Sequence, residues 1–251
     1  MLPAELQRAL DAVSRAEKLL ITCDFDGTLA PIVNNPEDAR MLPAAATALT
    51  ALTDLPDTEV ALVSGRALGV LSTLTGFSDI PAAIHLVGSH GAEFDTGFTH
   101  DIDEDLLARI IAELNAIAQG RPGVSVETKP ASVALHVRNA SSQDGEAALA
   151  DAHRASERWG AHATAGKAVL EFAVLSTNKG EAVDILREQT ASTAVVFLGD
   201  DVTDETAFVR LHDGDVGVKV GPGDTAAGFR IESPDDVAEA LGYLAQRRRE
   251  N

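Results

Sequence analysis

The sequence predicts an α/β fold in which a Rossmann-like parallel sheet forms the core and an α+β domain is inserted into it. Three observations lead to this prediction. Short apolar runs alternate with helical patterns in the first and last thirds of the 251-residue chain, as in parallel βαβ units. The middle third instead contains two helix–hairpin units, typical of antiparallel structure. Aromatic residues make up only 4% of the chain, so Ala, Val, Leu and Ile must fill the core.

The first third contains three apolar runs that are each typical of a buried strand. The predicted strands are Leu19–Phe25, Glu59–Ser64 and His85–Gly88. Helices rich in Ala and Leu are predicted between them, over Pro43–Leu55 and Ala67–Thr75. Before the first strand, an amphipathic pattern predicts a surface helix whose apolar side carries Leu6, Leu10 and Val13.

The middle of the chain follows a different order of elements. A helix is predicted over Asp103–Ala118, and the glycines at 120 and 123 end it. The elements that follow are a hairpin of Val124–Lys129 and Ser132–Asn139, a helix over Ser142–Trp159 and a hairpin over Ala161–Val174. We therefore predict an inserted domain over residues 98–174, and a core domain formed by residues 1–97 and 175–251.

The last third returns to alternating strands and helices. Its predicted strands are Ala194–Gly199 and Asp215–Val220, and its predicted helices are Lys179–Gln189, Asp204–Leu211 and Pro234–Arg247. These elements complete the parallel sheet that the first third begins.

The composition limits the kinds of partner. With 39 acidic against 20 basic residues, the net charge of −19 argues against nucleic acid or an anionic membrane as a partner, because both attract basic surfaces. The lone cysteine, Cys23, lies in an apolar run and predicts a buried core residue in a reducing compartment. No segment resembles a signal peptide or a membrane span, so we expect a cytoplasmic protein.

Two polar clusters follow the first two strands, where α/β sheets form their sites. Asp24 and Asp26 stand two residues apart in Asp-Phe-Asp-Gly-Thr, so one carboxylate can attack phosphorus while the other works as acid and base. The same residue types are also common in capped turns, but the position after a buried strand favours a catalytic function. Ser64, Gly65 and Arg66 end the second strand and can hold a phosphate through a hydroxyl and backbone N–H groups.

Two further clusters lie in the last third. Lys179 opens a helix, where the helix dipole disfavours a cation. This unfavourable position indicates that the lysine binds a phosphate and a carboxylate. A surface lysine without such partners is an equal alternative. Asp200, Asp201 and Asp204 follow the next strand and would repel one another without a cation. We predict Asp200 as a metal ligand and the other two as its supports, although part of the run also fits helix capping.

These four clusters, in this order, resemble the haloacid dehalogenase-like phosphatases. The resemblance implies that Asp24 is the nucleophile and Asp26 the acid/base, and that Ser64 and Lys179 bind the phosphoryl group. It also implies that Mg²⁺ binds to Asp24, to Asp200 and to the backbone carbonyl of Asp26. The inserted domain then corresponds to an α/β cap.

Within that superfamily the chain resembles the trehalose-6-phosphate phosphatases over nearly its whole length. The motifs that carry this resemblance are Gly88-Ser-His-Gly-Ala-Glu93, Glu127-x-Lys129-x-x-Ser132-x-x-x-His136-x-Arg138, Gly166-Lys-x-x-x-Glu171 and Gly199-Asp-Asp-x-Thr-Asp-Glu205. Lys129 and Arg138 offer positive charge to a phosphate, and Glu127 and Glu171 can accept hydrogen bonds from sugar hydroxyls.

Each of these residues has an alternative interpretation. Glu127 and Lys129 share one face of a strand and could form a plain surface pair. His136 fits a structural hydrogen bond better than a catalytic one, because Asp26 fills the acid/base role. For His90, substrate contact and packing at the junction between the domains are equally good interpretations. After Glu171 the chain continues with Phe172 and Ala173, whereas many relatives have a basic residue near that point. This difference argues against a basic substrate contact there and leaves the prediction for Glu171 unchanged.

The resemblance implies that the chain hydrolyses the small molecule trehalose 6-phosphate, the last step of trehalose biosynthesis, with a functional link to a trehalose-phosphate synthase. One alternative is another sugar-phosphate enzyme of the same fold, such as a sucrose-phosphate phosphatase or a phosphomannomutase. The other is a non-catalytic phosphosugar-binding module, which would need neither Asp24 nor Asp26 as reacting groups.

Overall fold

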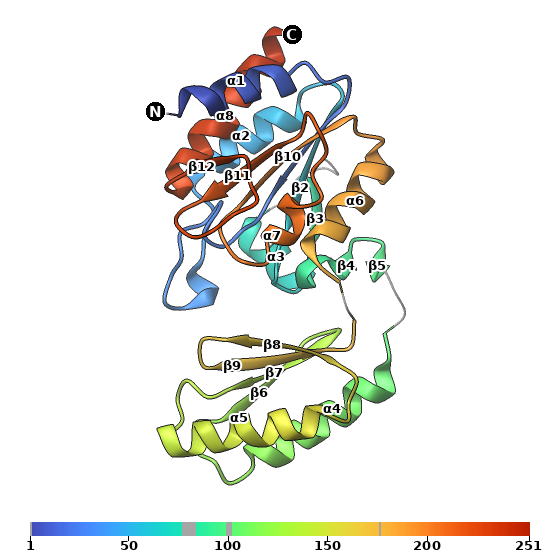
Figure 1. Cartoon of the computed structure of the whole chain (residues 1–251), viewed down its shortest axis with the longest axis vertical. Coiled ribbons are helices and arrows are strands. Elements are labelled where there is room, and N and C mark those ends of the chain that lie inside the picture. The colour runs from blue at the N-terminus through green and yellow to red at the C-terminus, as the bar shows by residue number, and fades with distance from the viewer. Residues whose placement is uncertain (1, 77–83, 99–101, 176) are drawn as a thin grey trace. The chain divides into compact units, whose positions relative to one another are not determined.

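The computed structural model describes residues 2–76, 84–98, 102–175 and 177–251. The chain divides into two compact units (Figure 1). The core domain comprises Met1–Gly97 and Thr177–Asn251, and the inserted domain comprises Phe98–Ser176. The functions predicted for these units, catalysis and a cap, stay predictions.

The core domain is built on a six-stranded, fully parallel sheet of order β12-β11-β10-β1-β2-β3. Its strands are β1 (Leu19–Cys23), β2 (Thr58–Val63), β3 (Ile84–Val87), β10 (Ala194–Gly199), β11 (Val216–Val220) and β12 (Phe229–Ile231). Every residue of β1 and β10 is buried, as expected of central strands covered on both faces. The parallel α/β fold predicted from the apolar runs is confirmed.

Helices cover both faces of this sheet (Figure 1). One face packs against α1 (Ala4–Val13), α2 (Pro43–Thr53) and α8 (Pro234–Glu250). The other packs against α6 (Lys179–Thr190) and the short α7 (Glu205–Phe208). Cys23 is buried in the first of these clusters, as predicted, and burial raises the pKa of its thiol. Its neighbours make it a packing residue.

Smaller elements lie near the carboxyl ends of the first three strands. They are α3 (Leu68–Thr75), the short 3-10 helices η1 (Pro36–Asp38) and η3 (Ser89–Gly91), and the paired strands β4 (Glu93–Phe94) and β5 (Gly97–Phe98). The sequence analysis did not predict β4, β5 or β12, because two or three residues give no periodicity to detect.

The inserted domain packs two helices against one face of a four-stranded antiparallel sheet of order β6-β7-β9-β8. Its elements are α4 (Glu104–Ala118), β6 (Ser125–Thr128), β7 (Ser132–His136), α5 (Ser142–Ser156), β8 (His162–Gly166) and β9 (Val169–Ala173). Val133, Leu135, Leu170 and Phe172 face the helices, and Trp159 meets the Phe172 ring edge-on at 4.9 Å. The two predicted helix–hairpin units therefore share one sheet and one hydrophobic core.

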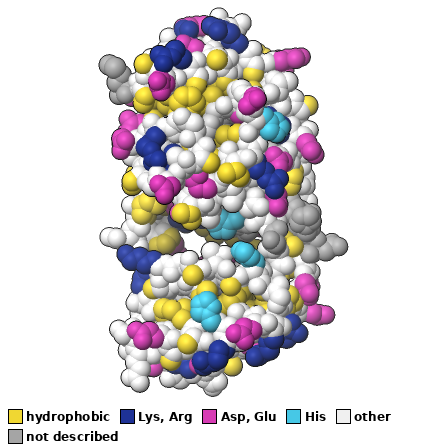
Figure 2. Space-filling view, viewed as in Figure 1, with side chains coloured by type: hydrophobic (Ala, Val, Ile, Leu, Met, Phe, Trp, Pro, Cys, Tyr) yellow, Lys and Arg dark blue, Asp and Glu magenta, His cyan; other side chains and the backbone are white. Residues whose placement is uncertain are grey.

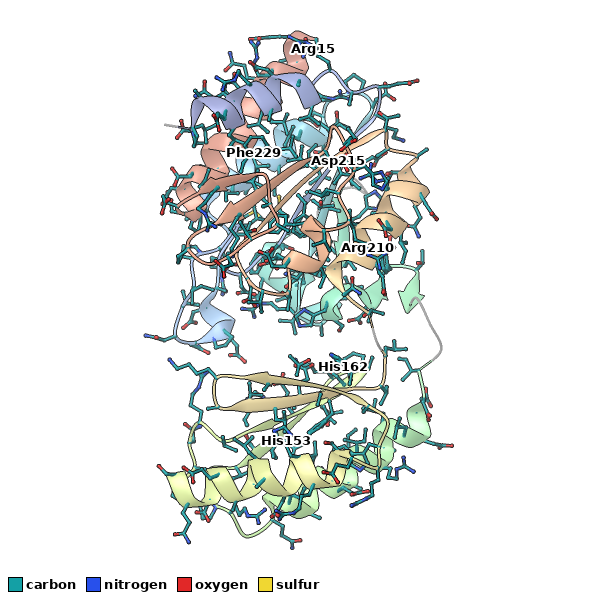
Figure 3. All side chains as sticks on the ribbon, viewed as in Figure 1. Arg15, His153, His162, Arg210, Asp215 and Phe229 are labelled. Carbon is teal, nitrogen blue, oxygen red and sulfur yellow. The ribbon has the colours of Figure 1, made fainter. Side chains whose placement is uncertain are left out.

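The alternate residues of this sheet form its other face. In the strand register Glu127 lies opposite Ala134, which lies opposite Glu171. Figure 3 shows His162, from β8, on the side of the sheet opposite α5, the helix that carries His153. We call the face that contains Glu127, Ser132, His136, His162 and Glu171 the polar face of the inserted domain.

Several predicted elements are shorter in the structure. The strand predicted to reach Asn139 ends at His136, and the helix predicted over Asp204–Leu211 is only Glu205–Phe208. The first strand ends at Cys23 because the chain then turns, with the N–H groups of Leu29 and Ala30 donating to the carbonyl of Phe25. This turn releases Asp24 and Asp26 from the sheet.

The surface carries charged side chains of both signs. On the face drawn in Figure 2, Lys and Arg side chains lie interspersed with Asp and Glu. Across the residues that the structure describes, no helix has both the length and the apolar character needed to span a membrane.

Candidate active site

Three neighbouring strands each deliver a polar side chain to the same edge of the core sheet. Asp24 follows the last residue of β1, Ser64 follows β2 and Asp200 follows β10. These strands are adjacent and parallel, so their carboxyl ends meet at one edge. The backbone N–H of Asp24 still donates to the carbonyl of Leu198 at 2.9 Å, which fixes the start of the loop that follows β1.

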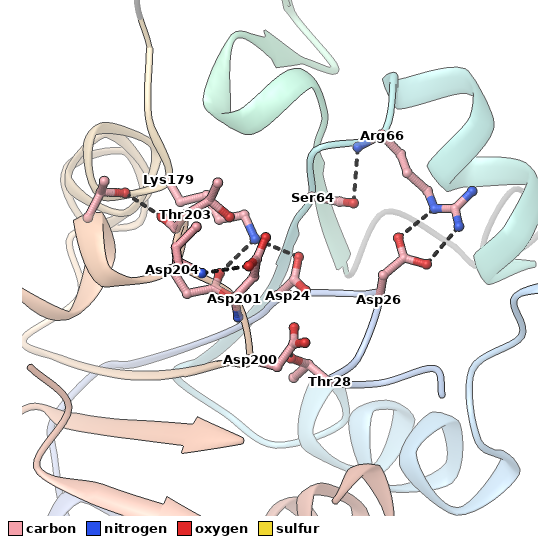
Figure 4. Close-up of polar contacts among 12 residues, drawn as sticks. Asp24, Asp26, Thr28, Ser64, Arg66, Lys179, Asp200, Asp201, Thr203 and Asp204 are labelled. Atoms are coloured by element: carbon pink, nitrogen blue, oxygen red, sulfur yellow. Dashed lines mark hydrogen bonds and ion pairs between the residues drawn. The ribbon is translucent and has the colours of Figure 1, made fainter. Parts of the chain in front are cut away.

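Lys179 is the central cation of this site (Figure 4). Its Nζ donates to Asp24 Oδ1 at 2.7 Å and to Asp204 Oδ1 at 2.6 Å. Lys179 is 2% exposed, Asp24 is 4% exposed and Asp204 is fully buried. Asn178 caps α6 by accepting from the N–H of Glu181, so the helix begins where the lysine is needed. Of the two interpretations of Lys179, the surface lysine is wrong.

The charges of the site do not balance. Burial and the charges of Asp204 and Asp200 raise the pKa of Asp24 to about 8, although Lys179 opposes the shift. Burial and Asp204 likewise raise the pKa of Asp200 to about 6. Burial alone would lower the pKa of Lys179, but the carboxylates of Asp24 and Asp204 outweigh it and raise that pKa. One ammonium group therefore does not compensate three carboxylates, and the site favours a further cation.

The donor atoms suit a hard divalent cation. Asp24, Asp200 and Asp204 each offer a carboxylate oxygen, and these oxygens lie within 4.8 Å of one another. An all-oxygen donor set is typical of Mg²⁺ or Ca²⁺ sites. Asp204 already accepts from Lys179 with one oxygen and from the N–H of Asp201 with the other. Asp24 and Asp200 therefore have more lone pairs left for a metal than Asp204.

Gly27 lets the chain pass close to Asp200. Its φ is +81°, in the left-handed region, and a Cβ atom there would overlap the Asp200 carboxylate. Thr28 follows and donates from Oγ1 to Asp200 Oδ1 at 3.4 Å. The loop after β1 thus positions Asp200 as well as supplying Asp24.

Asp26 has a partner that the sequence analysis did not assign to it. The guanidinium of Arg66 donates from Nε to Asp26 Oδ2 and from a terminal nitrogen to Oδ1, both at 2.6 Å. In Figure 4 the Asp26 carboxylate points toward Arg66, while that of Asp24 points toward Lys179. Binding of substrate by Gly65 and Arg66, which the sequence suggests from their place after the second strand, stays a prediction.

The turn after β2 is held by the loop that contains η3. The N–H of His90 donates to the carbonyl of Ser64 at 2.9 Å, and the N–H of Ser89 donates to that of Arg66 at 2.7 Å. A Cβ atom on Gly65 would overlap the His90 ring, so a glycine is needed there. The structure therefore places His90 in packing contact with the predicted phosphate-binding turn, whereas its substrate contact stays a prediction.

The predicted sugar-binding residues form two pairs on or beside the polar face of the inserted domain. Glu171 accepts from Lys129 Nζ at 2.9 Å and from Ser132 Oγ at 2.6 Å. Glu127 lies 2.7 Å from the ring of His136. Glu127 and Lys129 therefore pair with other residues, and His136 has a structural hydrogen bond, as the sequence suggested. Arg138 is exposed, beyond the end of β7.

Lys219 is a site residue that the sequence analysis missed. It lies in β11, is 3% exposed, and its Nζ donates to the backbone carbonyl of Asp200. A lone lysine within the apolar run Val-Gly-Val-Lys-Val was the available signal, because a buried lysine needs a partner. It adds a second cation beside the acidic loop.

The fold and this site define the class of protein. The arrangement is that of haloacid dehalogenase-like hydrolases, and solved structures of this class share the fold. It consists of a parallel sheet with an aspartate after its central strand, a buried lysine at a helix start and an acidic loop after the adjacent strand.

The sequence identifies the family. Residues 22–233 match the trehalose-phosphatase family, and the chain belongs to it. A trehalose-phosphate phosphatase of Mycobacterium marinum is 36% identical over 97% of this chain and 67% of its own length. A trehalose-6-phosphate phosphatase of Escherichia coli is 34% identical over 91% of this chain and 88% of its own.

A solved structure extends the likeness to three dimensions. The C-terminal domain of a Candida albicans trehalose-6-phosphate phosphatase matches with a TM-score of 0.75 at 23% identity, covering 96% of both chains. At that identity the match concerns the fold, and it covers both the core and the inserted domain.

Proposed function

We propose that this chain hydrolyses trehalose 6-phosphate to trehalose and inorganic phosphate through an aspartyl-phosphate on Asp24. The observation that carries the proposal is the buried Asp24–Lys179–Asp204 group beside Asp200, in a chain that matches the trehalose-phosphatase family over residues 22–233.

The first step transfers the phosphoryl group to the protein. A carboxylate oxygen of Asp24 attacks phosphorus, and the bond between phosphorus and the sugar 6-oxygen breaks. Asp26 gives its proton to that oxygen, so the sugar leaves as an alcohol. Lys179, already 2.7 Å from Asp24, and the Ser64 hydroxyl stabilise the negative charge on the phosphoryl oxygens.

The second step restores the protein. Asp26, now ionised, takes a proton from water, and the water oxygen attacks phosphorus. The bond between phosphorus and the Asp24 oxygen breaks, releasing inorganic phosphate and the free carboxylate. Asp26 ends the cycle protonated, as it began.

We propose Mg²⁺ as the cofactor, held by Asp24 and Asp200 with the backbone carbonyl of Asp26, as the family resemblance implies. The all-oxygen donor set and the uncompensated carboxylates support this choice. When bound, the ion would neutralise the charge on the phosphoryl group. Asp204 and Asp201 support the acidic loop through the hydrogen bond that joins them.

We propose that the inserted domain acts as the cap that recognises the sugar. On or beside its polar face lie carboxylates, the Lys129 ammonium group and the Ser132 hydroxyl, which match the many hydroxyls of a disaccharide. Glu127, Lys129, Arg138 and Glu171 are the proposed contacts. The family match supports trehalose 6-phosphate over the sucrose-phosphate and phosphomannomutase alternatives. The synthase link and a cytoplasmic location stay predictions.

Phosphate release from a panel of substrates tests the proposal. The panel contains trehalose 6-phosphate, sucrose 6-phosphate, glucose 6-phosphate, mannose 6-phosphate and p-nitrophenyl phosphate, each with Mg²⁺ or with EDTA. We expect trehalose 6-phosphate to be preferred, activity to require Mg²⁺, and Asp24→Asn to abolish turnover while the protein stays folded. Turnover by Asp24→Asn would exclude the aspartyl-phosphate, and preference for another sugar would exclude the substrate.

A further inference from the structure

Both oxygens of the Asp26 carboxylate accept hydrogen bonds from one arginine, Arg66. Arg66 makes two parallel hydrogen bonds of 2.6 Å to Asp26, the geometry in which a guanidinium matches a carboxylate best. The side chains are 15% and 32% exposed, so the pair lies at the border between protein and solvent. In the described part of the chain, no other side chain hydrogen-bonds to this carboxylate.

Arg66 is itself fixed at three points. Its backbone N–H donates to Ser64 Oγ at 3.2 Å, and its carbonyl accepts from the N–H of Ser89 at 2.7 Å. Its guanidinium lies 5.8 Å from the centre of the fully buried Phe25 ring, within the range of a cation–π contact. Both partners of the ion pair are therefore tied to the ends of adjacent strands, β1 and β2.

We propose that Arg66 is a positioning residue that acts through Asp26, orienting its carboxylate as the base that activates water in the second step. This inference rests on the proposed function, in which Asp26 works as acid and base. The two parallel hydrogen bonds fix the orientation of the Asp26 carboxylate, so that it can keep one position relative to the attacking water. A catalytic base is typically oriented by a further group, and Arg66 occupies that place for Asp26.

The role is distinct from that of Lys179. Lys179 contacts the nucleophile Asp24 and Asp204, whereas Arg66 contacts only the acid/base carboxylate among these acids. Loss of Arg66 should therefore slow hydrolysis of the aspartyl-phosphate more than its formation. The phosphorylated protein should accumulate, and kcat and KM should fall together, because a slower second step lowers both and leaves kcat/KM nearly unchanged.

A double-mutant cycle on kcat tests this directly, with the full chain, Mg²⁺ and trehalose 6-phosphate labelled with ³²P. The variants are Arg66→Met, Asp26→Asn and both together. We expect Arg66→Met to lower kcat about 10- to 100-fold when Asp26 is present, which is a part of the roughly 10²- to 10⁴-fold that a positioned general base contributes. In the Asp26→Asn background the same substitution should cost less than about 3-fold. Acid quenching should show more ³²P bound to Arg66→Met than to the wild type.

Two further variants keep the test decisive. Arg247→Met removes another arginine–aspartate contact, from Arg247 Nε to Asp11 Oδ1 at 2.7 Å, between α1 and α8, and should leave kcat unchanged. Arg66→Lys keeps the positive charge but cannot make two parallel hydrogen bonds, so its kcat should lie between those of the wild type and Arg66→Met. If Arg66→Met folds poorly, Arg66→Lys takes its place in the cycle.

Equal losses in both Asp26 backgrounds would overturn the inference, because Arg66 would then act independently of Asp26. A rise in KM alone would overturn it too and would assign Arg66 to the substrate phosphate. Neither result would affect the proposed function. That function fails only if the wild type does not release phosphate from trehalose 6-phosphate, or if Asp24→Asn still releases it.

Discussion

Replacing Lys179 by methionine removes a cation that is buried between two carboxylates, Asp24 and Asp204. The ammonium group lies 2.7 Å from Asp24 Oδ1 and 2.6 Å from Asp204 Oδ1, and it is 2% exposed. Methionine has a similar volume and no charge, so the substitution leaves the packing nearly intact and both carboxylates without their ammonium partner. We expect a large loss of stability in the metal-free protein.

The magnitude follows from the burial of the group. Breaking a buried ion pair by removing one partner costs about 3–5 kcal/mol, because the other charge stays buried and unpaired. A domain of 150–250 residues loses about 2–4 °C in thermal midpoint for each kcal/mol, so the expected decrease is about 6–20 °C. Lys18→Met is the control: Lys18 pairs with Glu59 at 3.2 Å near the surface, and its loss should cost less than about 1 kcal/mol.

The loss should depend on pH. The pKa of Asp24 is about 8 in the folded protein against 3.8 when unperturbed, so at pH 5.5 the carboxyl group is protonated in the folded state and needs no cation. At pH 8.5 the wild type is mostly ionised at Asp24 beside Lys179, whereas Lys179→Met lacks the ammonium group that lowers this pKa, so the substitution then costs most. The difference in thermal midpoint between the wild type and Lys179→Met should therefore be larger at pH 8.5 than at pH 5.5.

Differential scanning fluorimetry in EDTA at both pH values measures this, since EDTA prevents a divalent cation from replacing the ammonium group. A midpoint for Lys179→Met within about 2 °C of the wild type at pH 8.5 would refute the reasoning, because it would mean that the buried ammonium group contributes no net stability. A loss that grows toward pH 5.5 would refute the assignment to Asp24.

Three further predictions concern the metal, the glycine turn and the inserted domain. In EDTA the thermal midpoint of the wild type should fall as pH rises from about 5 to about 8, because the pKa of Asp24 is about 8 in the folded state and 3.8 in the unfolded state. Mg²⁺ should raise the midpoint more at pH 8 than at pH 5. A midpoint in EDTA that rises with pH would contradict this. Gly27→Ala should increase the Mg²⁺ concentration for half-maximal activity by about 10-fold or more, since displacement of Asp200 needs to cost only about 1.4 kcal/mol of Mg²⁺-binding free energy for that change. Gly76→Ala is the control: its φ is a similar +68° but its Cβ would lie in open space, so it should only lower stability. Equal Mg²⁺ requirements for the two variants would show that Gly27 does not position Asp200. Lys129→Ala should reduce kcat/KM for trehalose 6-phosphate at least about 10-fold more than for p-nitrophenyl phosphate, and equal losses would remove Lys129 from sugar recognition.

The sequence predicted where the site lies because its clusters follow buried strands. Asp24, Ser64 and Asp200 each stand one residue after an apolar run, and parallel strands bring such positions to one edge. For Lys179 the sequence left a surface position as an equal alternative, and only its burial in the structure decides between the two. The order of elements was thus sufficient for the side chains that follow the strands.

The partners of these side chains were harder to predict. Arg66 and Asp26 are 40 residues apart, and only the adjacency of β1 and β2 brings them together. Asp204 was open to a capping interpretation, but it makes no cap hydrogen bond in α7, because its oxygens accept from Lys179 and from the N–H of Asp201. Pairings of this kind depend on rotamers and distances between strands, which a residue pattern does not contain.

The alternation of the inserted sheet has a consequence for how its surface can change over evolution. Along β9, Leu170 and Phe172 belong to the hydrophobic core, while Glu171 between them lies on the polar face, and Ser132 and His136 alternate in the same way with Val133 and Leu135 along β7. Each polar side chain can therefore be exchanged by a single mutation that leaves every buried neighbour in place. The family can diversify this face one residue at a time, at little risk to the folding of the domain that presents it.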